Sequence, residues 1–492
     1  MTAHGTRAGE DSDDLDVEEA LALVNERPDR FARGHTPDRS AGAHHPGDDT
    51  GRPDHGGPHR PDHGGPHGPH PGGPHRPHSS HHPAATWAEA RAAAERAPRH
   101  RAGSRTGHLT PVAVPLAATL GLTLAAPLNA LTDLPSFDTS AMDGWAVSGP
   151  GPWEVREEGV LAGHAGHAPL TDGEAVRIAT GARIPPDTTA VLRSEHGRTD
   201  GKGRLHITAA DRAPHTVTPG QDIRPRGQEC RSGDQLLPVG TLVTPPVLGM
   251  AAAAGYDTLT AVPRPRAAVF VLGDELLGEG LPHDGLIRDA LGPLLPPWLR
   301  ALGAEVTEVR RVSDDEQALY RAITACDAEV IVTTGGTAAG PVDHVHPTLR
   351  RIGADLLVDG VTVRPGHPML LARTKDDQYL VGLPGNPLAA VSGLLTLAEP
   401  LLRTLAARPA PEPYTLPLRD AVQGHPYDTR LIPVVLRGDR ALPLLYNGPA
   451  MLRGVAAADA LAVVPPGGSG PGEETELLDL PWASGGIGVC FT

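Results

Sequence analysis

The sequence contains almost no lysine. Only Lys202 and Lys375 are lysines among 43 basic residues, and the other 41 are arginines. The formal net charge is −16 and no lysine-rich run occurs, which argues against a general nucleic-acid binder. A catalytic amine therefore has only two positions that it could occupy.

Aromatic residues, cysteines and long apolar runs are also scarce. With 15 aromatic residues in 492, the cores are expected to consist of Ala, Leu and Val. Cys230, Cys326 and Cys490 are odd in number and far apart, which predicts free thiols in a reducing cytoplasm. The apolar stretches are interrupted, as at Glu399 and Pro400, and the acidic N-terminus does not resemble a signal peptide. We therefore expect a cytoplasmic protein with no membrane segment.

Glycine and proline, in contrast, are abundant. They number 59 and 53, nearly a quarter of the chain, which approaches the composition of low-complexity sequence. A chain of 492 residues is long enough for three or four domains. We therefore expect one part of the chain to be disordered and the rest to form several domains.

Residues 1–85 are expected to be a disordered extension. The stretch 53–83 contains nine His, nine Pro and seven Gly, and a Pro-Asp-His-Gly-Gly-Pro-His unit occurs twice within it. Such a composition cannot bury a core. Its closely spaced imidazoles suit capture of Zn²⁺, Ni²⁺ or Cu²⁺, and a solvated linker of biased composition explains them equally well. The candidate ligands for such a metal are His55, His59, His63 and His67.

From Thr86 onward the patterns predict folded domains. Thr86–Ala97 has the pattern of a helix, with Thr86 and Glu89 forming a capping box. Short β-like runs between residues 136 and 229, separated by Gly and Pro, predict a small β-rich domain. These runs are Trp153–Val155, Ala175–Ile178, Ala190–Leu192 and Leu205–Ile207.

After Pro265 predicted strands alternate with predicted helices, which indicates a parallel sheet with helices on both faces. The expected strands are Ala267–Leu272, Val306–Val309, Val330–Thr333 and Tyr379–Val381. The expected helices are Leu286–Leu302, a helix from a capping box at Ser313–Glu316 to about Cys326, and one after Pro387 to about Ala406. The residues from about Pro409 onward predict a small β domain.

Three of these strand ends carry loops that suit an anion and a hard cation. Ligands of open α/β sheets bind beyond the carboxyl ends of the strands. Glycines let backbone N–H groups approach an anion, and carboxylates nearby suit a bridging Mg²⁺. The loops together predict a site for a phosphorylated ligand, although each alone is explained as a turn, and its acids as helix N-terminal charges. The segments are Gly273-Asp274-Glu275, Gly335-Gly336 with Asp343, and Pro384-Gly385-Asn386-Pro387.

The motifs, taken in order, resemble those of the molybdopterin molybdenumtransferase (MoeA) family, which includes a domain of gephyrin. Ser140-Ala141-Met142-Asp143-Gly144-Trp145-Ala146 is similar to the family's Ser-Ala-Met-Asp-Gly-Tyr-Ala signature. Further similar segments are Thr180-Gly181-Ala182, Gly227-Gln228-Glu229, Gly233-Asp234, Gly273-Asp274-Glu275-Leu276, the Gly335-Gly336 loop with Asp343, Arg364-Pro365-Gly366-His367-Pro368 and Leu383-Pro384-Gly385-Asn386-Pro387.

The resemblance implies a multidomain α/β and β fold. A molybdopterin-binding-type parallel sheet domain with helices on both faces is expected beside an inserted small β-rich domain, an elongated N-terminal segment and a C-terminal small β-barrel-like domain. The expected boundaries are 1–85 for the extension, 86–128 with 230–262 for a discontinuous N-terminal domain, 129–229 for the β-rich domain, 263–408 for the molybdopterin-binding domain and 409–492 for the C-terminal domain.

The resemblance also implies an activity and its residues. The reaction is insertion of molybdate into adenylylated molybdopterin with release of AMP, assisted by Mg²⁺. A homodimer is implied in which Asp143 of one subunit meets Glu275 of the other, and the molybdopterin adenylyltransferase is an expected partner. The implied catalytic residues are Asp143, Thr180, Glu229, Glu275, Asp314 and Asp343, of which Glu275, Asp314 and Asp343 would hold Mg²⁺. The implied substrate-binding residues are Gly335, Gly336, Arg364, Pro384, Gly385, Asn386 and Pro387.

Several positions depart from the family pattern. The family has Lys-Pro-Gly-Lys-Pro where this chain has Arg364 and His367, and Gly360 stands where some members carry a further lysine. The carboxylates that the resemblance implies are all present, so an enzyme is still the leading hypothesis. The alternatives are a non-catalytic protein that binds pterin or molybdate and uses a metal-binding His-rich tail, and a structural scaffold of the gephyrin kind.

Overall fold

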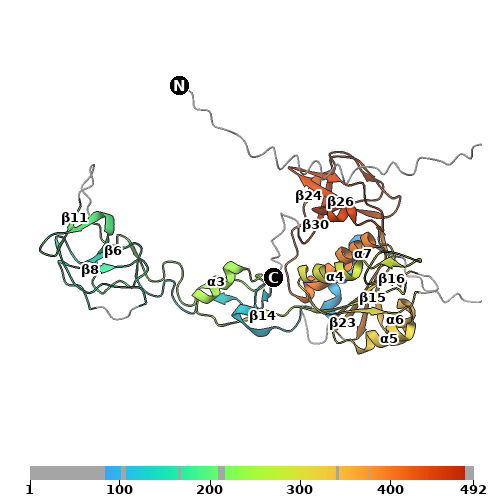
Figure 1. Ribbon diagram of the computed structural model, residues 1–492, viewed down its shortest axis with the longest axis horizontal. Coiled ribbons are helices and arrows are strands. Elements are labelled where there is room, and N and C mark those ends of the chain that lie inside the picture. Colours follow the sequence, from blue (N-terminus) through green and yellow to red (C-terminus); the bar gives the residue numbers. More distant parts are fainter. Residues whose placement is uncertain are drawn as a thin grey trace, which may run out of the picture. The chain divides into compact units, whose positions relative to one another are not determined.

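The computed structural model describes residues 84–100, 107–163, 168–208, 217–338, 343–375 and 377–482 (Figure 1). The extension with its candidate ligands His55, His59, His63 and His67 lies outside the described residues, except for residues 84 and 85, and so does Cys490. Cys230 and Cys326 are free, as predicted. Both are also buried, and this burial raises the pKa of both thiols.

A six-stranded sheet in the order β18-β15-β19-β23-β22-β20 carries the strand-end loops. Its strands are β15 (Arg266–Leu272), β18 (Glu305–Val312), β19 (Val330–Thr334), β20 (Asp355–Asp359), β22 (Leu370–Lys375) and β23 (Gln378–Leu383). The pairs β18·β15, β15·β19 and β19·β23 are parallel, so the predicted parallel sheet is confirmed for four strands. The antiparallel strands β22 and β20 extend it, and the sequence patterns did not predict them.

Helices cover both faces of this sheet (Figure 1). α5 (Glu316–Ala325) and α6 (Val345–Ile352) pack on the face that bears Ala268 and Phe270. α4 (Leu291–Ala301) and the helical run that follows β23 contact the strands as well. α2 (Trp87–Arg96) packs on that run, and its predicted capping box is present, with the Thr86 N–H donating to Glu89 Oε2 at 2.9 Å.

The helix predicted after Pro387 to about Ala406 is confirmed as one continuous helical run. α7 (Pro387–Gly393), a π-helical turn (η5, Leu394–Ala398) and α8 (Glu399–Leu405) follow one another without a break. By length and composition alone this run of 19 residues could cross a membrane, but 83% of its apolar window is buried inside the fold, as in a core helix. Glu399 and Pro400, which interrupt the apolar sequence, do not end the helical run: the π-helical turn precedes Pro400, and the Glu399 carboxylate accepts from Arg403 at 3.0 Å.

The helix expected from Leu286 begins later, at Leu291. Residues 287–288 instead form the short strand β17 (Ile287–Arg288), which pairs with β16 (Leu276–Leu277). Ala290 is the N-cap, and the preceding Asp289 accepts through Oδ1 from the N–H groups of the first two helical residues, Leu291 at 3.0 Å and Gly292 at 2.9 Å.

The capping box expected at Ser313–Glu316 does not form. The N-cap of α5 is Asp315, whose Oδ1 accepts from the Ala318 N–H at 2.6 Å. The Asp315 N–H donates to the Ser313 carbonyl at 2.7 Å, so a turn occupies the place of the first helical residues. This shift leaves the neighbouring Asp314 carboxylate outside the helix cap.

The predicted β-rich domain is confirmed as a six-stranded sheet in the order β10-β11-β7-β8-β6-β9. Its strands are β6 (Gly144–Val147), β7 (Trp153–Val155), β8 (Glu174–Ile178), β9 (Ala190–Arg193), β10 (Gly197–Thr199) and β11 (Arg204–Ile207). Trp145 and Val147 face one apolar core and Ala146 faces another, so successive residues of β6 alternate between two buried faces.

Smaller elements connect this domain to the mixed sheet. β14 (Thr258–Val262) pairs with β2 (Val112–Pro115) and β3 (Thr123–Leu124), and β13 (Gln235–Leu237) pairs with β4 (Leu128–Asn129). β12 (Ile223–Arg224) pairs with β5 (Thr139–Ser140). The helix α3 (Pro245–Ala253) packs with them around Leu124 and Leu259.

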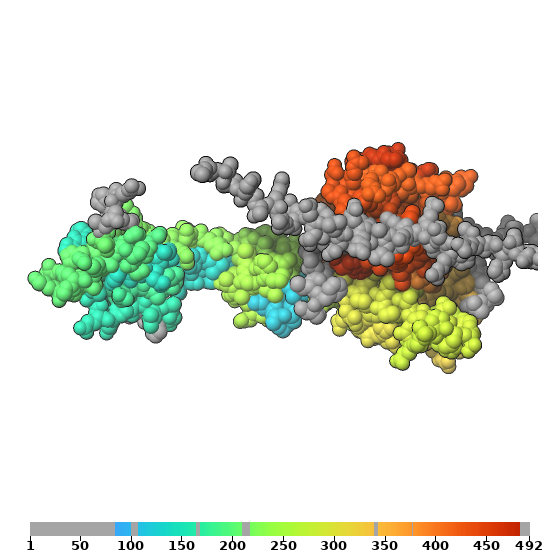
Figure 2. Space-filling view, turned by 45° about the horizontal axis from the view of Figure 1, so that its top comes forward, coloured from blue at the N-terminus to red at the C-terminus, as the bar shows by residue number. Residues whose placement is uncertain are grey.

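The C-terminal β domain, coloured orange and red in Figure 2, is a seven-stranded sheet. Its own strands are β24 (Thr415–Pro417), β26 (Thr429–Arg437), β27 (Arg440–Pro443), β28 (Ala460–Val464) and β30 (Glu474–Asp479). Two strands come from earlier in the chain: β1 (Ala85–Thr86) pairs with β21 (Val361–Arg364), and β21 pairs with β26. No local pattern predicted these two additions.

Candidate functional site

The loops after β15, β19 and β23 lie side by side at the carboxyl edge of the mixed sheet. The Gly335 N–H donates to the Leu383 carbonyl at 2.8 Å. A Cβ placed on Gly385 would lie 3.7 Å from the Gly335 Cα, so these two loops are in contact. The Leu272 N–H donates to Thr334 Oγ1 at 3.4 Å. The structure thus brings together the glycine loops that the strand order predicted.

The Gly335-Gly336 turn depends on glycine. The two residues have φ angles of 77° and 65°, a region that residues with a Cβ rarely adopt. The chain then passes close to β23, because a Cβ on Gly382 would lie 2.8 Å from Thr337 Cγ2. The turn therefore keeps the backbone tight against the strand end.

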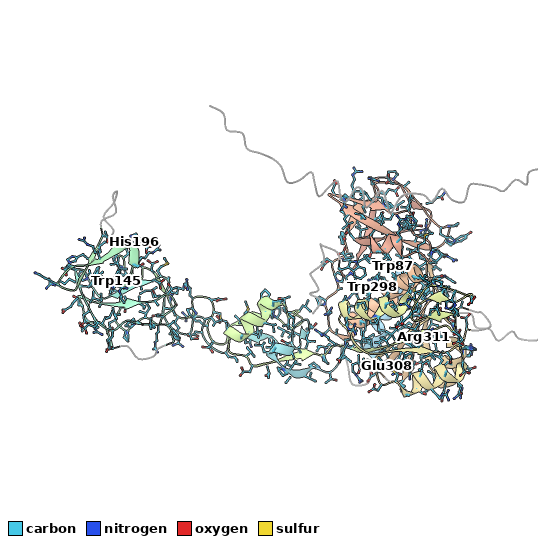
Figure 3. The ribbon with its side chains drawn as sticks, in the orientation of Figure 1. Trp87, Trp145, His196, Trp298, Glu308 and Arg311 are labelled. Carbon is cyan, nitrogen blue, oxygen red and sulfur yellow. The ribbon has the colours of Figure 1, made fainter. Side chains whose placement is uncertain are left out.

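Asp314 links the loop after β15 to the loop after β18. Its Oδ2 accepts from the Asp274 N–H at 3.1 Å. A Cβ on Gly273 would lie 2.6 Å from Glu275 Oε2, so the Glu275 carboxylate folds back over this loop. Arg311 of β18, labelled in Figure 3, donates to the Gly273 carbonyl at 3.4 Å. Glu275 and Asp314 thus belong to one loop cluster.

Asp343 lies next to the glycine loop. It precedes His344, the N-cap of α6, and the Val345 N–H donates to the Gly336 carbonyl at 3.4 Å. Among the residues that the structure describes, no group of three His, Cys, Asp or Glu side chains is arranged to hold a metal ion. Mg²⁺ usually needs only one or two carboxylates together with substrate phosphates, and Glu275 with Asp314 fits that role.

The Arg364–Pro368 loop presents less positive charge than its sequence suggests. Arg364 Nε donates to Asp428 Oδ2 at 2.7 Å, and the side chains of the two residues are 52% and 9% exposed. His367 Nδ1 lies 2.7 Å from the Val361 carbonyl, to which it donates, so this nitrogen is turned toward the backbone. The loop therefore offers one permanent cation, which is already paired.

The first turn of α7 is already hydrogen-bonded. Pro387 occupies the first position after Asn386, where a missing N–H costs nothing. The N–H groups of Leu388 and Ala389 both donate to the Pro449 carbonyl, at 2.9 and 3.2 Å. Pro384 to Pro387 therefore shape the loop, and these two N–H groups are occupied in this conformation.

Asp143 and Thr180 are brought together in the β-rich domain. Asp143 Oδ1 accepts from the Thr180 N–H at 2.7 Å, and the Asp143 carbonyl accepts from the Ser194 N–H at 2.9 Å. The loop is braced by Asp222, whose carbonyl accepts from the Ala141 N–H at 2.8 Å. Hydrogen bonds from Arg193 to the Asp222 carboxylate, both at 2.9 Å, lower the pKa of that carboxyl.

A cavity of about 320 Å³ opens beside Asp143. Trp145, Arg177 and Ser194 also line it. The motif comparison singled out Asp143 but assigned no role to Trp145 or Arg177. Both residues lie next to motif residues in the sequence and could have been considered: Trp145 stands where the family has Tyr, and Arg177 lies three residues before Thr180.

Glu229 lies away from this cavity. Its N–H donates to the Leu134 carbonyl at 2.9 Å, and its side chain is exposed on the loop that follows β12. Asp143 lies in the loop before β6 and Glu275 in the loop after β15, which are strands of different sheets, and among the described residues no hydrogen bond or ion pair joins them. That they meet across a dimer stays a prediction.

Comparison with known proteins assigns the chain to a family. The description "MoeA N-terminal region (domain I and II)" matches residues 85–255, "Probable molybdopterin binding domain" matches 268–404, and "MoeA C-terminal region (domain IV)" matches 415–480. The molybdopterin molybdenumtransferase 2 of Mycobacterium tuberculosis (strain CDC 1551 / Oshkosh) is 34% identical over 365 residues, which are 70% of this chain and 87% of the relative. The chain belongs to the MoeA family.

Other MoeA proteins agree with this assignment. The molybdopterin molybdenumtransferase of Staphylococcus aureus (strain Mu50 / ATCC 700699) is 28% identical over 366 residues, covering 70% of this chain and 85% of the relative. The solved structure of a molybdopterin biosynthesis MoeA protein from Pyrococcus horikosii has the same fold, with a TM-score of 0.65, 24% identity and coverage of 81% and 99%. The chain is thus a transferase of the MoeA family and acts in molybdenum cofactor biosynthesis.

Proposed function

We propose that this MoeA protein inserts molybdate into adenylylated molybdopterin in the cytoplasm and releases AMP with the help of Mg²⁺. The observation that supports this most is the contact of the glycine loops at Gly335 and Gly385, next to the loop that Glu275 and Asp314 share. Such an arrangement suits a phosphorylated ligand with a hard cation.

The chain's own groups have separable tasks in this reaction. AMP release cleaves a phosphoanhydride bond, and Mg²⁺ held by Glu275 and Asp314 would neutralise charge on the phosphates. The Thr180 N–H fixes Oδ1 of Asp143, and Oδ2 of the same carboxylate makes no hydrogen bond with the described residues. Asp143 can therefore present that oxygen to the substrate in one orientation.

The test is AMP release by the purified full-length protein. Adenylylated molybdopterin, Mg²⁺ and molybdate are supplied, and AMP is measured by chromatography. Glu275→Gln and Asp143→Asn should abolish release. Glu308→Gln is the matched control, because Glu308 lies on β18 in an exposed pair with Arg310 at 3.2 Å. Full activity of Glu275→Gln would contradict the assignment.

The homodimer is part of the proposal and has its own test. If Asp143 and Glu275 meet across two subunits, a mixed dimer of the Asp143→Asn and Glu275→Gln chains contains one intact cleft. Random mixing should then restore about a quarter of wild-type activity from two inactive proteins. No recovery in verified mixed dimers would contradict a shared cleft. Delivery of the substrate by the molybdopterin adenylyltransferase is a further part of the proposal, tested by co-purification.

A further inference from the structure

The cavity in the β-rich domain contains one acid and one cation. Asp143 and Arg177 are its two charged lining residues. Trp145 and Arg177 are direct partners across β6 and β8, so their side chains share a face. The guanidinium carbon of Arg177 lies 5.2 Å from the Trp145 ring centroid. Figure 3 shows Trp145 inside this domain, below His196.

Arg177 differs from the paired arginines of the same domain. Arg156 pairs with Glu174, and Arg193 pairs with Asp222. The Arg177 guanidinium makes no hydrogen bond or ion pair with the described residues, and its residue is exposed. A guanidinium stacked on an indole keeps its N–H groups directed outward and is weakly hydrated, which suits a phosphate.

The indole of Trp145 forms part of the cavity wall. Trp145 is 4% exposed, and its Nε1–H is itself fully buried without an acceptor among the described residues, so other atoms of the ring face the cavity. The cavity therefore combines a cation without an ionic partner, an aromatic wall and a carboxylate that the Thr180 N–H holds in place.

We propose that this cavity binds the adenylate half of the substrate and that Arg177 pairs with its phosphate oxygens. The inference rests on the proposed function. A volume of about 320 Å³ is at the small end of ligand pockets, which span roughly 300–1,000 Å³, and it suits a nucleotide part instead of the whole adenylylated pterin. The phosphate would then pair with the Arg177 guanidinium that lies over the Trp145 ring.

The experiment measures AMP and adenosine binding to the full-length protein by titration calorimetry. Arg177→Ala should weaken AMP binding roughly tenfold or more, and Arg177→Lys should recover part of the loss. Adenosine lacks the phosphate, so its affinity should be the same for wild type and Arg177→Ala. Arg183→Ala is the matched control, because Arg183 stacks on Phe137 at 5.7 Å but does not line the cavity. Its AMP affinity should match that of wild type.

Steady-state kinetics provides a second readout. Arg177→Ala should raise KM for the adenylylated substrate much more than it lowers kcat, because a residue that only binds the phosphate contributes to both ground and transition states. A fall in kcat at unchanged KM would overturn the binding role. Near-ultraviolet circular dichroism of the Trp145 environment, and the partly rescued Arg177→Lys, separate this effect from misfolding.

The outcomes separate the inference from the proposed function. Unchanged AMP affinity in Arg177→Ala, equal losses for AMP and adenosine, or no AMP binding by wild type would each overturn the inference. If wild type binds AMP through Arg177 but releases none from the substrate, the cavity stands and the proposed function fails. If wild type releases AMP while Arg177→Ala binds AMP normally, the proposed function stands and the inference fails.

Discussion

Replacing Arg364 should loosen the junction between the mixed-sheet domain and the C-terminal domain. Arg364 ends β21 and donates to Asp428, which directly precedes β26 and has a side chain only 9% exposed. Breaking a fully buried ion pair costs about 3–5 kcal/mol, and breaking an exposed one costs less than about 1 kcal/mol. Because Arg364 itself is 52% exposed, we expect Arg364→Ala to cost about 1.5 kcal/mol locally.

Hydrogen exchange read by mass spectrometry measures this cost on the full-length protein. A loss of about 1.4 kcal/mol corresponds to roughly tenfold faster exchange in peptides that open locally, here those that span residues 361–368 and 428–430. Arg419→Ala is the control, because Arg419 and Asp420 form a pair at 3.0 Å with side chains 56% and 59% exposed. It should change exchange by less than about fivefold.

A double-mutant cycle provides the result that would refute this reasoning. In an Asp428→Asn background the removal of Arg364 should cost much less than in wild type, because the buried charge is already gone. If the two substitutions are additive to within about 0.3 kcal/mol, the pair does not hold the junction, and backbone pairing of β21 with β26 does.

Three further predictions concern the site and its domain. The Arg156 hydrogen bond lowers the pKa of Glu174 from 4.5 to about 2, so the stability that the Arg156–Glu174 pair adds is present above about pH 4.5 and is lost as the pH falls toward 2. Acid titration followed by tryptophan fluorescence should show this loss, and Glu174→Gln should remove the pH dependence. Asp314→Asn keeps an acceptor for the Asp274 N–H, so the melting temperature should stay unchanged while AMP release falls. Asp314→Ala should lower both the melting temperature and AMP release. Retained activity in Asp314→Asn would exclude a role for the charge of Asp314. Gly335 has a φ angle of 77°, so Gly335→Ala should lower the free energy of unfolding by about 1 kcal/mol and remove most of the AMP release. Gly353 has a φ angle of 70° at the end of α6, so Gly353→Ala should lose similar stability but keep its activity in the same assays.

The sequence predicted best what depends on local pattern. The buried strands β15, β19 and β23 were found as apolar runs, because a strand covered on both faces needs no polar alternation. The short strands of the β-rich domain were found because Gly and Pro mark their ends. The capping box at Thr86 was also correct, since all of its partners lie within one turn.

The errors came from contacts between distant residues. Ile287 fits the apolar pattern of the following helix, but in β17 it pairs with Leu276, eleven residues earlier, and α4 therefore begins later. Ser313 and Asp315 are both good N-caps, and local pattern could not choose between them. A strand of two residues such as β1 leaves no periodicity to detect.

In the candidate site, too, residues within motifs could be predicted, and partners that are distant in the sequence could not. Motif order identified Asp143, Thr180, Glu275 and the glycine loops, and the structure places the first two in one hydrogen bond. Asp428, the partner of Arg364, could not be identified because it lies 64 positions further along the chain and matches no motif. The Pro449 carbonyl that occupies the start of α7 is a backbone group, which residue identity does not reveal.

The sheet that β1, β21 and β26 share also constrains the order of synthesis. β1 can pair only after β21 has been made, and the other side of β21 stays an open edge until β26 follows. Such an edge exposes unpaired backbone groups, which invite wrong pairing. A chain that ends near residue 408 would therefore contain β1 and β21 without the rest of their sheet. This MoeA protein should accordingly fold late in translation, and fragments that end between its domains should aggregate.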